Sequence, residues 1–383
     1  MLKLWMQRAL LLFAGFLASL FLAEIALRIW TPASLEYKSV RQSDPVLHHK
    51  FNPSSHCVYR TAEFDVEVRV NSMGLRDREY EPSEIDSAYR IVVLGDSFTE
   101  GIGVPMESTC AKRLETGLNA LHPERRCVVF NFGIAGYSPI LEYLQLKQKG
   151  ISLHPHLVIL SYDMTDVQED FLYGEDAEFT AEGIPVKVHP SLPDFGRKSC
   201  FPRGVLKTYL QENLFTYSLF ATFIAQTRPP LPFERGNIRS SRFVHTVDSV
   251  EGPWHEHFAR SQSYVKLISD LCSREGAQFL LVVFPRGHQV NSREWIEGRK
   301  AWGLDSAVIS SAIFKSLAMF AGREGIQYLD MTQTFRDRSH GDLYFPVDGH
   351  WTAAGHKVAA DTLLSFLIGS SWLKKPWPAA VLK

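Results

Sequence analysis

The sequence predicts an α/β protein with a parallel sheet, preceded by a helix that spans a membrane. Two patterns lead to this prediction. An uncharged segment lies near the N-terminus, and further along the chain short apolar runs alternate with amphipathic stretches. Such runs, separated by helical patterns, are typical of a parallel sheet with helices on both faces. The runs are residues 90–94, 127–131, 156–160, 278–284 and 327–329, and the amphipathic stretches are residues 107–121, 258–275 and 306–324.

The N-terminal segment predicts the location of the protein. Residues 9–23 carry no charge, whereas Lys3, Arg8 and the amino terminus place positive charge before them. This order is typical of an export signal whose N-terminus stays inside. Small residues at the spacing of a cleavage site are missing, so a retained anchor over residues 1–32, ended by Pro32, is favoured over a removed signal peptide. We therefore expect a single-pass membrane protein with its folded domain periplasmic or extracellular.

Composition and cysteine spacing exclude several classes of protein. Of the 383 residues, 45% are hydrophobic and 22% are charged, and the formal net charge is -1. These values fit a packed globular enzyme and argue against a nucleic-acid-binding protein. The five cysteines form no CxxC pair, so no metal site is expected. We expect buried thiols, with a Cys110–Cys127 bridge as the alternative in an exported domain.

The chain divides into three regions. Residues 33–89 are interpreted as a linker followed by a β-hairpin, because apolar and polar residues alternate between Cys57 and Val70. Residues 90–370 form the α/β domain. Within it, residues 171–257 are rich in proline and phenylalanine and are too long for an ordinary connection. We expect this insertion to lie over the carboxyl edge of the sheet, where such sheets bind ligands.

Three residues carry the predicted chemistry. The first strand runs into Gly95-Asp96-Ser97, which places the Ser97 hydroxyl on a sharp turn at the carboxyl edge of the sheet. A serine needs an adjacent base to attack a carbonyl group. Asp348 and His350, two residues apart near the C-terminus, project on the same side of an extended backbone. They complete a Ser-His-Asp arrangement. A G-x-S-x-G motif is missing, which disfavours the α/β-hydrolase fold.

The motifs of the chain resemble those of the SGNH, or GDSL-like, hydrolase family, in a membrane-anchored bacterial form. The resemblance covers most of residues 70–368 and rests on ordered blocks at residues 71–76, 95–104, 131–138, 158–167 and 348–356. It implies a flavodoxin-like three-layer fold. It also implies that Ser97 is the nucleophile and an oxyanion donor, that Gly136 is a backbone oxyanion donor, and that His350 is the base.

One position departs from the family pattern. Where the family has an oxyanion asparagine, this sequence has Thr165, followed by the expected Asp166. A threonine hydroxyl donates one hydrogen bond but is shorter than a carboxamide. Losing one oxyanion donor costs about 10²- to 10³-fold in rate. Slow turnover, or a compensating donor from the insertion at residues 171–257, is therefore expected. Arg286, after the fourth strand, is within reach of the cleft or forms a surface salt bridge.

These residues favour a serine esterase that forms an acyl-enzyme and needs no cofactor. The expected substrate is an acyl ester, such as an O-acyl group on an envelope glycan or lipid. The same triad can pass the acyl group to a sugar hydroxyl, so a polysaccharide O-acyltransferase is the first alternative. A catalytically silent envelope scaffold is the second, because fold alone does not separate these functions. The sequence leaves the acyl length and the oligomeric state open.

Overall fold

The computed structural model describes residues 2–29, 37, 39–123, 125–190, 214, 216–217, 238, 254–301, 304, 312–370 and 372. Several sequence-based expectations fall on other residues. Pro32, Cys200 and most of the insertion at residues 171–257 lie outside the described residues.

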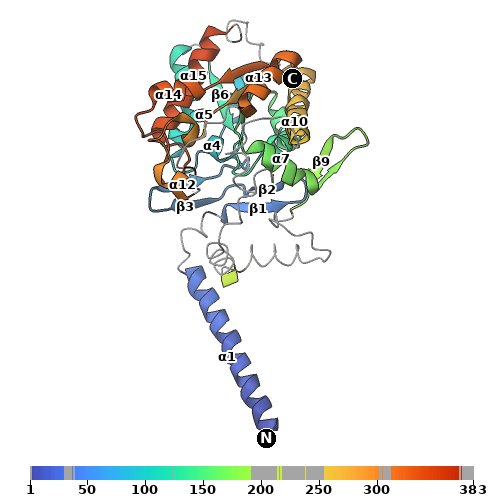
Figure 1. The fold of residues 1–383 in the computed structure, drawn as a ribbon, viewed down its shortest axis with the longest axis vertical. Coiled ribbons are helices and arrows are strands. Elements are labelled where there is room, and N and C mark those ends of the chain that lie inside the picture. Colours follow the sequence, from blue (N-terminus) through green and yellow to red (C-terminus); the bar gives the residue numbers. More distant parts are fainter. Residues whose placement is uncertain are drawn as a thin grey trace.

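Helix α1 (Leu2–Ile29) projects from the rest of the protein, with the N-terminus at its far end (Figure 1). Its span Trp5–Leu27 has 23 residues, a mean hydropathy of 2.3 and only 6% of its most apolar window buried. A core helix would be mostly covered, and this one is not. By length and composition α1 is a candidate membrane anchor, although a signal sequence has the same properties.

Five parallel strands form the central sheet, in the spatial order β11-β10-β7-β5-β6. If β5, β6, β7, β10 and β11 are numbered 1 to 5 along the chain, the order read from β6 is 2-1-3-4-5, as in flavodoxin-like folds. The topological switch point therefore lies between β5 and β7, where ligands bind in such sheets. The strands are β5 (Tyr89–Leu94), β6 (Cys127–Asn131), β7 (Leu157–Tyr162), β10 (Gln278–Val283) and β11 (Gln327–Asp330).

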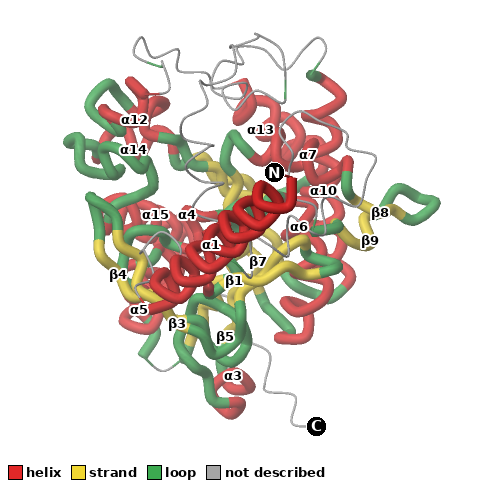
Figure 2. The backbone as a smooth tube through the Cα atoms, turned by 90° about the horizontal axis from the view of Figure 1, so that it is seen from below, coloured by secondary structure: helices red, strands yellow, loops and turns green. Residues whose placement is uncertain are grey.

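Helices cover both faces of this sheet, which confirms the predicted three-layer architecture. Successive residues of β5 alternate between two buried cores: Ile91 and Val93 belong to one, and Val92 and Leu94 to the other. The first core packs against α5 (Cys110–Leu121), α14 (Thr332–Arg338) and α15 (Ala353–Gly369). The second packs against α6 (Pro139–Gln145), α7 (Asp166–Glu175), α10 (His255–Arg274) and α13 (Ala312–Glu324). Figure 2 shows α6, α7 and α10 on the opposite side from α15.

Short elements complete the described chain. They are α3 (Pro82–Ser87), α4 (Ser97–Glu100), the 3₁₀ turns η1 (Met106–Ser108) and η3 (Ile151–Leu153), the π-helical turn η2 (Leu146–Gly150), α11 (Gly287–Val290) and α12 (Ile296–Ala301). The π-helical turn continues α6 directly.

Two hairpins precede the sheet, where the sequence suggested a linker and one hairpin. The first pairs β1 (Arg41–Asp44) with β2 (His48–Phe51), and the second pairs β3 (His56–Arg60) with β4 (Asp65–Arg69). They lie on the side of the domain that faces α1 (Figure 1). The first hairpin was missed because RQSD and HHKF show no apolar alternation.

Part of the insertion is described. It contains a third hairpin, β8 (Ala177–Phe179) with β9 (Pro185–Val188). Further along, Thr216 donates from its backbone N and its Oγ1 to Glu24 Oε2, at 2.9 and 2.8 Å. The insertion therefore contacts the end of α1 that lies nearest to the domain.

The alternative Cys110–Cys127 bridge is not formed. Cys110, Cys127 and Cys272 are free and buried, and Cys57 is buried as well. Cys110 opens α5, whereas the backbone of Cys127 is hydrogen-bonded on both sides by Asn119, near the other end of that helix. Nine helical residues span about 13 Å, well beyond the reach of a disulfide.

Candidate active site

Strand β5 ends at the turn that carries Ser97. A Cβ atom on Gly95 would lie 2.1 Å from Thr99 Oγ1, so the turn accepts only glycine there. Asp96 then caps α4 by accepting a hydrogen bond from the backbone N of Phe98 at 2.8 Å. Ser97 is the first residue of α4 and is partly buried. Its own N–H lies at the helix N-terminus, where no intrahelical acceptor is available.

The structure brings Ser97, His350 and Asp348 together. His350 Nε2 lies 2.8 Å from Ser97 Oγ, and His350 Nδ1 lies 2.5 Å from Asp348 Oδ1. With Nδ1 donating to the carboxylate, Nε2 is left to accept the serine proton. Burial by itself would raise the pKa of Asp348, but the hydrogen bond and charge of His350 lower it below its usual value. Asp348 is thus ionised over the neutral pH range.

Two glutamates hold the loop that carries Asp348 and His350. Glu63, in the turn between β3 and β4, accepts from the backbone N of Val347 and of Asp348 at 2.8 and 2.7 Å. Glu294, fully buried, accepts from the backbone of the residues just before this loop. The acid and base are therefore positioned by side chains from two distant segments.

Gly136, the expected backbone oxyanion donor, lies in a constrained loop. Its φ is +80°, which glycine adopts at little cost. Tyr173 Oη donates to the Gly136 carbonyl at 2.7 Å, which fixes the orientation of the peptide. The Gly136 N–H has no hydrogen-bond acceptor among the residues that the structure describes. It is thus available to a ligand.

Glu100 links this loop to the nucleophile helix. It is fully buried, and its Oε2 accepts from the backbone N of Ala135 at 2.7 Å and from Arg41 Nη2 at 2.6 Å. Its Oε1 accepts from the Tyr37 hydroxyl. The loop also approaches α4 closely, because a Cβ atom on Gly133 would lie 2.2 Å from the backbone N of Glu100. The Glu100 carboxylate thus ties the loop that carries Ala135 and Gly136 to the helix that begins at Ser97.

Thr165 stands at the N-terminus of α7, beyond β7. Its hydroxyl donates to Asp163 Oδ1 at 2.6 Å and accepts from Arg286 Nη2 at 3.2 Å. Arg286 also donates to Asp163 Oδ2, from Nε at 2.8 Å and from Nη2 at 2.6 Å. Arg286 was expected at the cleft or in a surface salt bridge. Its salt bridge is not a surface one, because the Asp163 carboxylate is fully buried, and the Arg286 side chain stays 22% exposed.

Buried acids surround this ion pair. Burial and the neighbouring Asp163 raise the pKa of Asp96 to about 7, against the opposing effect of Arg286. Burial likewise raises the pKa of Asp170, on α7, to about 7. Both carboxyl groups therefore change protonation near neutral pH. Within the described ranges, no group of three or more His, Cys, Asp or Glu side chains is arranged to hold a metal ion.

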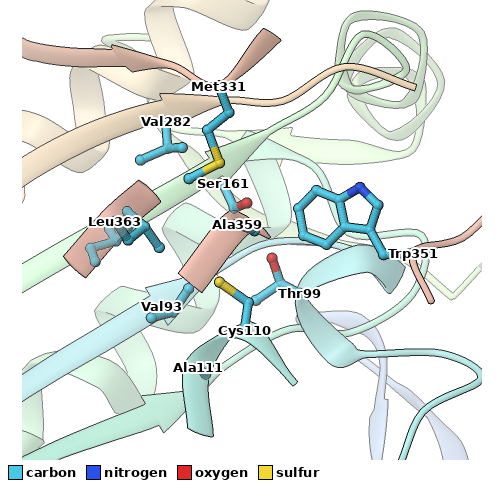
Figure 3. A pocket seen from close by; sticks show the side chains of 11 residues that line it. Val93, Thr99, Cys110, Ala111, Ser161, Val282, Met331, Trp351, Ala359 and Leu363 are labelled. Carbon is cyan, nitrogen blue, oxygen red and sulfur yellow. The ribbon is translucent and has the colours of Figure 1, made fainter. Parts of the chain in front are cut away.

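A small cavity lies behind the nucleophile turn, on the α5 and α15 face of the sheet (Figure 3). Its volume is about 10 Å³, which is close to the minimum that holds one water. It is too small for an acyl group, and Ser97 is not among its lining residues. Its lining residues are Val93, Thr99, Cys110, Ala111, Ile159, Ser161, Val282, Met331, Trp351, Ala359 and Leu363.

Sequence reasoning missed Glu63, Glu100 and Glu294. Only Glu100 had a signal, since it lies one turn after Ser97 in the same short helix. Glu63 is more than 280 residues from the loop that it holds, and nothing in a hairpin turn marks such a partner.

Comparison with known proteins agrees with the fold and the motifs. Residues 245–376 match the family model described as "SGNH hydrolase-like domain, acetyltransferase AlgX". No curated protein matches the sequence. The match covers about a third of the chain, and it agrees, as does the flavodoxin-like strand order, with the SGNH hydrolase-like family that the motifs predicted. The class supports an acyl esterase or acetyltransferase type of activity, and the matched segment, which includes the Asp348 and His350 loop, is of the AlgX type.

Solved structures similar to the chain include two esterases and a protein of the G-D-S-L family. A two-domain esterase (CEX) active on acetylated mannans has 14% identity and a TM-score of 0.38, over 78% of this chain and 53% of that one. The chain thus spans about half the length of that protein. The acetylxylan esterase Axe2 from Geobacillus stearothermophilus has 12% identity and a TM-score of 0.41, over 76% of this chain and 98% of that one. A putative lipolytic protein of the G-D-S-L family from Desulfitobacterium hafniense DCB-2 has 11% identity and a TM-score of 0.37, over 72% of this chain and 98% of that one.

Proposed function

We propose that the protein is a serine-dependent acyl-ester hydrolase that works through an acyl-enzyme. The observation that carries this proposal is the continuous hydrogen-bonded chain from Ser97 Oγ through His350 to Asp348. Such a chain gives a serine hydroxyl the adjacent base that it needs to attack a carbonyl carbon.

The geometry supports a two-step reaction. Ser97 Oγ bonds to the acyl carbon while His350 Nε2 takes its proton, and Asp348 stabilises the imidazolium that forms. The oxyanion receives hydrogen bonds from the N–H groups of Ser97 and Gly136. The intermediate collapses, and His350 protonates the departing alcohol. Water then attacks the acyl-enzyme by the same route, which releases the acid and restores Ser97.

An acyltransferase is the second candidate, because the matching family model describes an acetyltransferase. Only the second step differs. A sugar hydroxyl takes the place of water, so the acyl group ends on an alcohol. Both candidates share the acylation of Ser97.

The location and substrate class are part of this proposal. Helix α1 would anchor the protein in the membrane with its N-terminus inside, because Lys3 and Arg8 precede the apolar span. The domain would then lie outside the cytoplasm. O-acyl groups on an envelope glycan or lipid are the esters available to it there.

The test is labelling of the full chain, in detergent, with a fluorophosphonate probe, followed by hydrolysis of a panel of nitrophenyl esters. Ser97→Ala should abolish labelling, and Ser97→Ala and His350→Ala should each lower ester cleavage by about 10⁴-fold or more. Their double variant should be no worse, because the residues act as a unit. Ser263→Ala, an exposed serine on α10, is the matched control.

Mass spectrometry of the product, with and without an oligosaccharide acceptor, then separates the two candidates. Free acid alone indicates a hydrolase, whereas an acylated oligosaccharide indicates a transferase. Undiminished labelling or cleavage by folded Ser97→Ala would refute both and leave a silent scaffold.

A further inference from the structure

The position after β7 lacks the side chain that would complete an oxyanion site. Thr165 has a single hydroxyl proton, and that proton is directed to Asp163 Oδ1 at 2.6 Å. The backbone N of Thr165 donates to the same oxygen, at 2.5 Å. Neither donor of Thr165 is therefore free for a substrate.

Arg286 lies directly beside this short side chain. Its Nη2 is 3.2 Å from Thr165 Oγ1, so the guanidinium occupies the space next to the missing carboxamide. The fork is fixed from one side, because Nε and Nη2 both donate to Asp163 Oδ2. Asp163 is fully buried, whereas the Arg286 side chain is 22% exposed.

The rest of the guanidinium is open. A guanidinium carries five N–H donors. Within the described ranges, Arg286 Nη1 has no hydrogen-bond partner. Buried side-chain atoms without a partner do occur in this protein, but Arg286 Nη1 is not among them. It is therefore accessible to solvent.

The exposed part of Arg286 borders the catalytic residues. Its Cζ lies 5.3 Å from the centroid of the Phe98 ring, and Phe98 directly follows Ser97. The same ring lies 4.9 Å from the His350 ring. A donor there approaches an ester carbonyl bound at Ser97 from the side of β7, opposite the Gly136 loop that follows β6.

We propose that Arg286 is a catalytic residue that donates from Nη1 to the oxyanion of the tetrahedral intermediate, in place of the absent carboxamide. Asp163 and Thr165 are positioning residues that hold its fork. This inference rests on the proposed serine acylation and adds a donor to it.

A charged donor is stronger than a carboxamide when it faces an anion, because charge-assisted hydrogen bonds are about twice as strong as neutral ones. Asp163 neutralises the guanidinium before the reaction. The developing negative charge on the substrate then adds an interaction that the neutral ester lacks, which is the requirement for a transition-state donor.

The experiment measures the acylation burst of the full-length, detergent-solubilised protein with p-nitrophenyl acetate. This ester is neutral, so recognition of a substrate anion plays no part, and the burst reports acylation in a hydrolase and in a transferase alike. Arg286→Lys keeps a cation beside Asp163 but lacks the planar fork. Arg336→Lys, at an arginine of α14 that donates to the Gln289 carbonyl, is the matched control.

We expect Arg286→Lys to lower the acylation rate about 10²-fold, with KM changed less than about twofold. Adding Thr165→Asn to Arg286→Lys should recover about tenfold, because a carboxamide restores a donor. A merely structural arginine would not be rescued in this way. Should Arg286→Lys fail to fold, Asp163→Asn with Arg286→Gln removes both charges together and takes its place in the same measurement.

Three results overturn the inference: an acylation rate within threefold of wild type in folded Arg286→Lys, a loss confined to KM, or no recovery with Thr165→Asn. Failure of the proposed function looks different, because wild type would then show no burst that depends on Ser97. In that case the role of Arg286 falls with it.

Discussion

Two substitutions of Glu100 test whether this residue positions the loop that carries Ala135 and Gly136, apart from its contribution to the stability of the fold. Three donors converge on its buried carboxylate: the hydroxyl of Tyr37, Arg41 Nη2 and the backbone N of Ala135. In Glu100→Gln, an amide oxygen can still accept from Arg41 and Ala135, but the counter-charge of Arg41 is lost. In Glu100→Ala, the Ala135 N–H loses its acceptor as well.

Both variants should therefore lose stability, and only Glu100→Ala should also lose rate. Breaking a buried ion pair costs about 3 kcal/mol, which for a domain of this size lowers Tm by about 6 to 10 °C. We expect that loss in Glu100→Gln and a larger loss in Glu100→Ala, where the Ala135 N–H also loses its acceptor. Acylation should stay within about threefold of wild type in Glu100→Gln and fall at least tenfold in Glu100→Ala, because an oxyanion donor is worth about 10²-fold when it is correctly placed.

The assay is the p-nitrophenyl acetate burst of the detergent-solubilised chain at saturating ester, with Tm from circular dichroism. Glu107→Ala, at an exposed glutamate a few residues further on, is the control and should match wild type in both measurements. Equal acylation rates in folded Glu100→Gln and Glu100→Ala would refute the argument, because the hydrogen bond to Ala135 would then contribute nothing to catalysis.

Three further predictions concern other parts of the molecule. Glu63→Gln should lower kcat about fivefold to tenfold with Tm unchanged, because one amide oxygen replaces the two carboxylate oxygens that accept from Val347 and Asp348. Glu67→Gln on β4 is the control, and equal kcat values in the two variants would contradict this prediction. Asp170 has a pKa of about 7 in the fold, above its unfolded value, so the unfolded chain releases that proton first and stability falls as pH rises. The free energy of unfolding, measured with urea, should therefore decrease between pH 5 and 8, and Asp170→Asn should make this decrease smaller by about 2 kcal/mol. If the variant and the wild type show the same change of free energy with pH, Asp170 is already ionised at pH 5. A phosphatase reporter fused after residue 383 should be active outside the cytoplasm, and a cytoplasmic signal would reverse the proposed topology.

The central sheet was predictable because its signal is local. Each strand is a short run of apolar residues buried on both faces, as in Cys127–Asn131, and such runs stand out between amphipathic stretches. The residues brought together at the site, Ser97, Asp348 and His350, were also predictable. Ser97 lies at the carboxyl edge because it follows β5, whereas Asp348 and His350 were predicted from their motif before the last helix.

The first hairpin and the missing disulfide show where local patterns fail. The strands Arg41–Asp44 and His48–Phe51 are mostly polar, and they pair because they pack on the domain and not because they alternate. The Cys110–Cys127 alternative assumed that the ends of one helical segment meet. A straight helix keeps its ends apart, and Cys127 returns only to the neighbourhood of Asn119.

The contacts that position the site were beyond prediction for a different reason. Glu63, Glu100 and Glu294 each act on backbone N–H groups: Glu63 at Asp348, Glu100 beside Gly136, and Glu294 before the acid and base loop. Every residue except proline carries that donor, so the partner position has no characteristic side chain. The same applies to Arg286, whose partner Asp163 lies more than 120 residues away. A substitution at Gly136 or His350 can be recognised as damaging from the sequence. Damage caused by changing the glutamates becomes apparent only when the loops that they hold are seen in three dimensions.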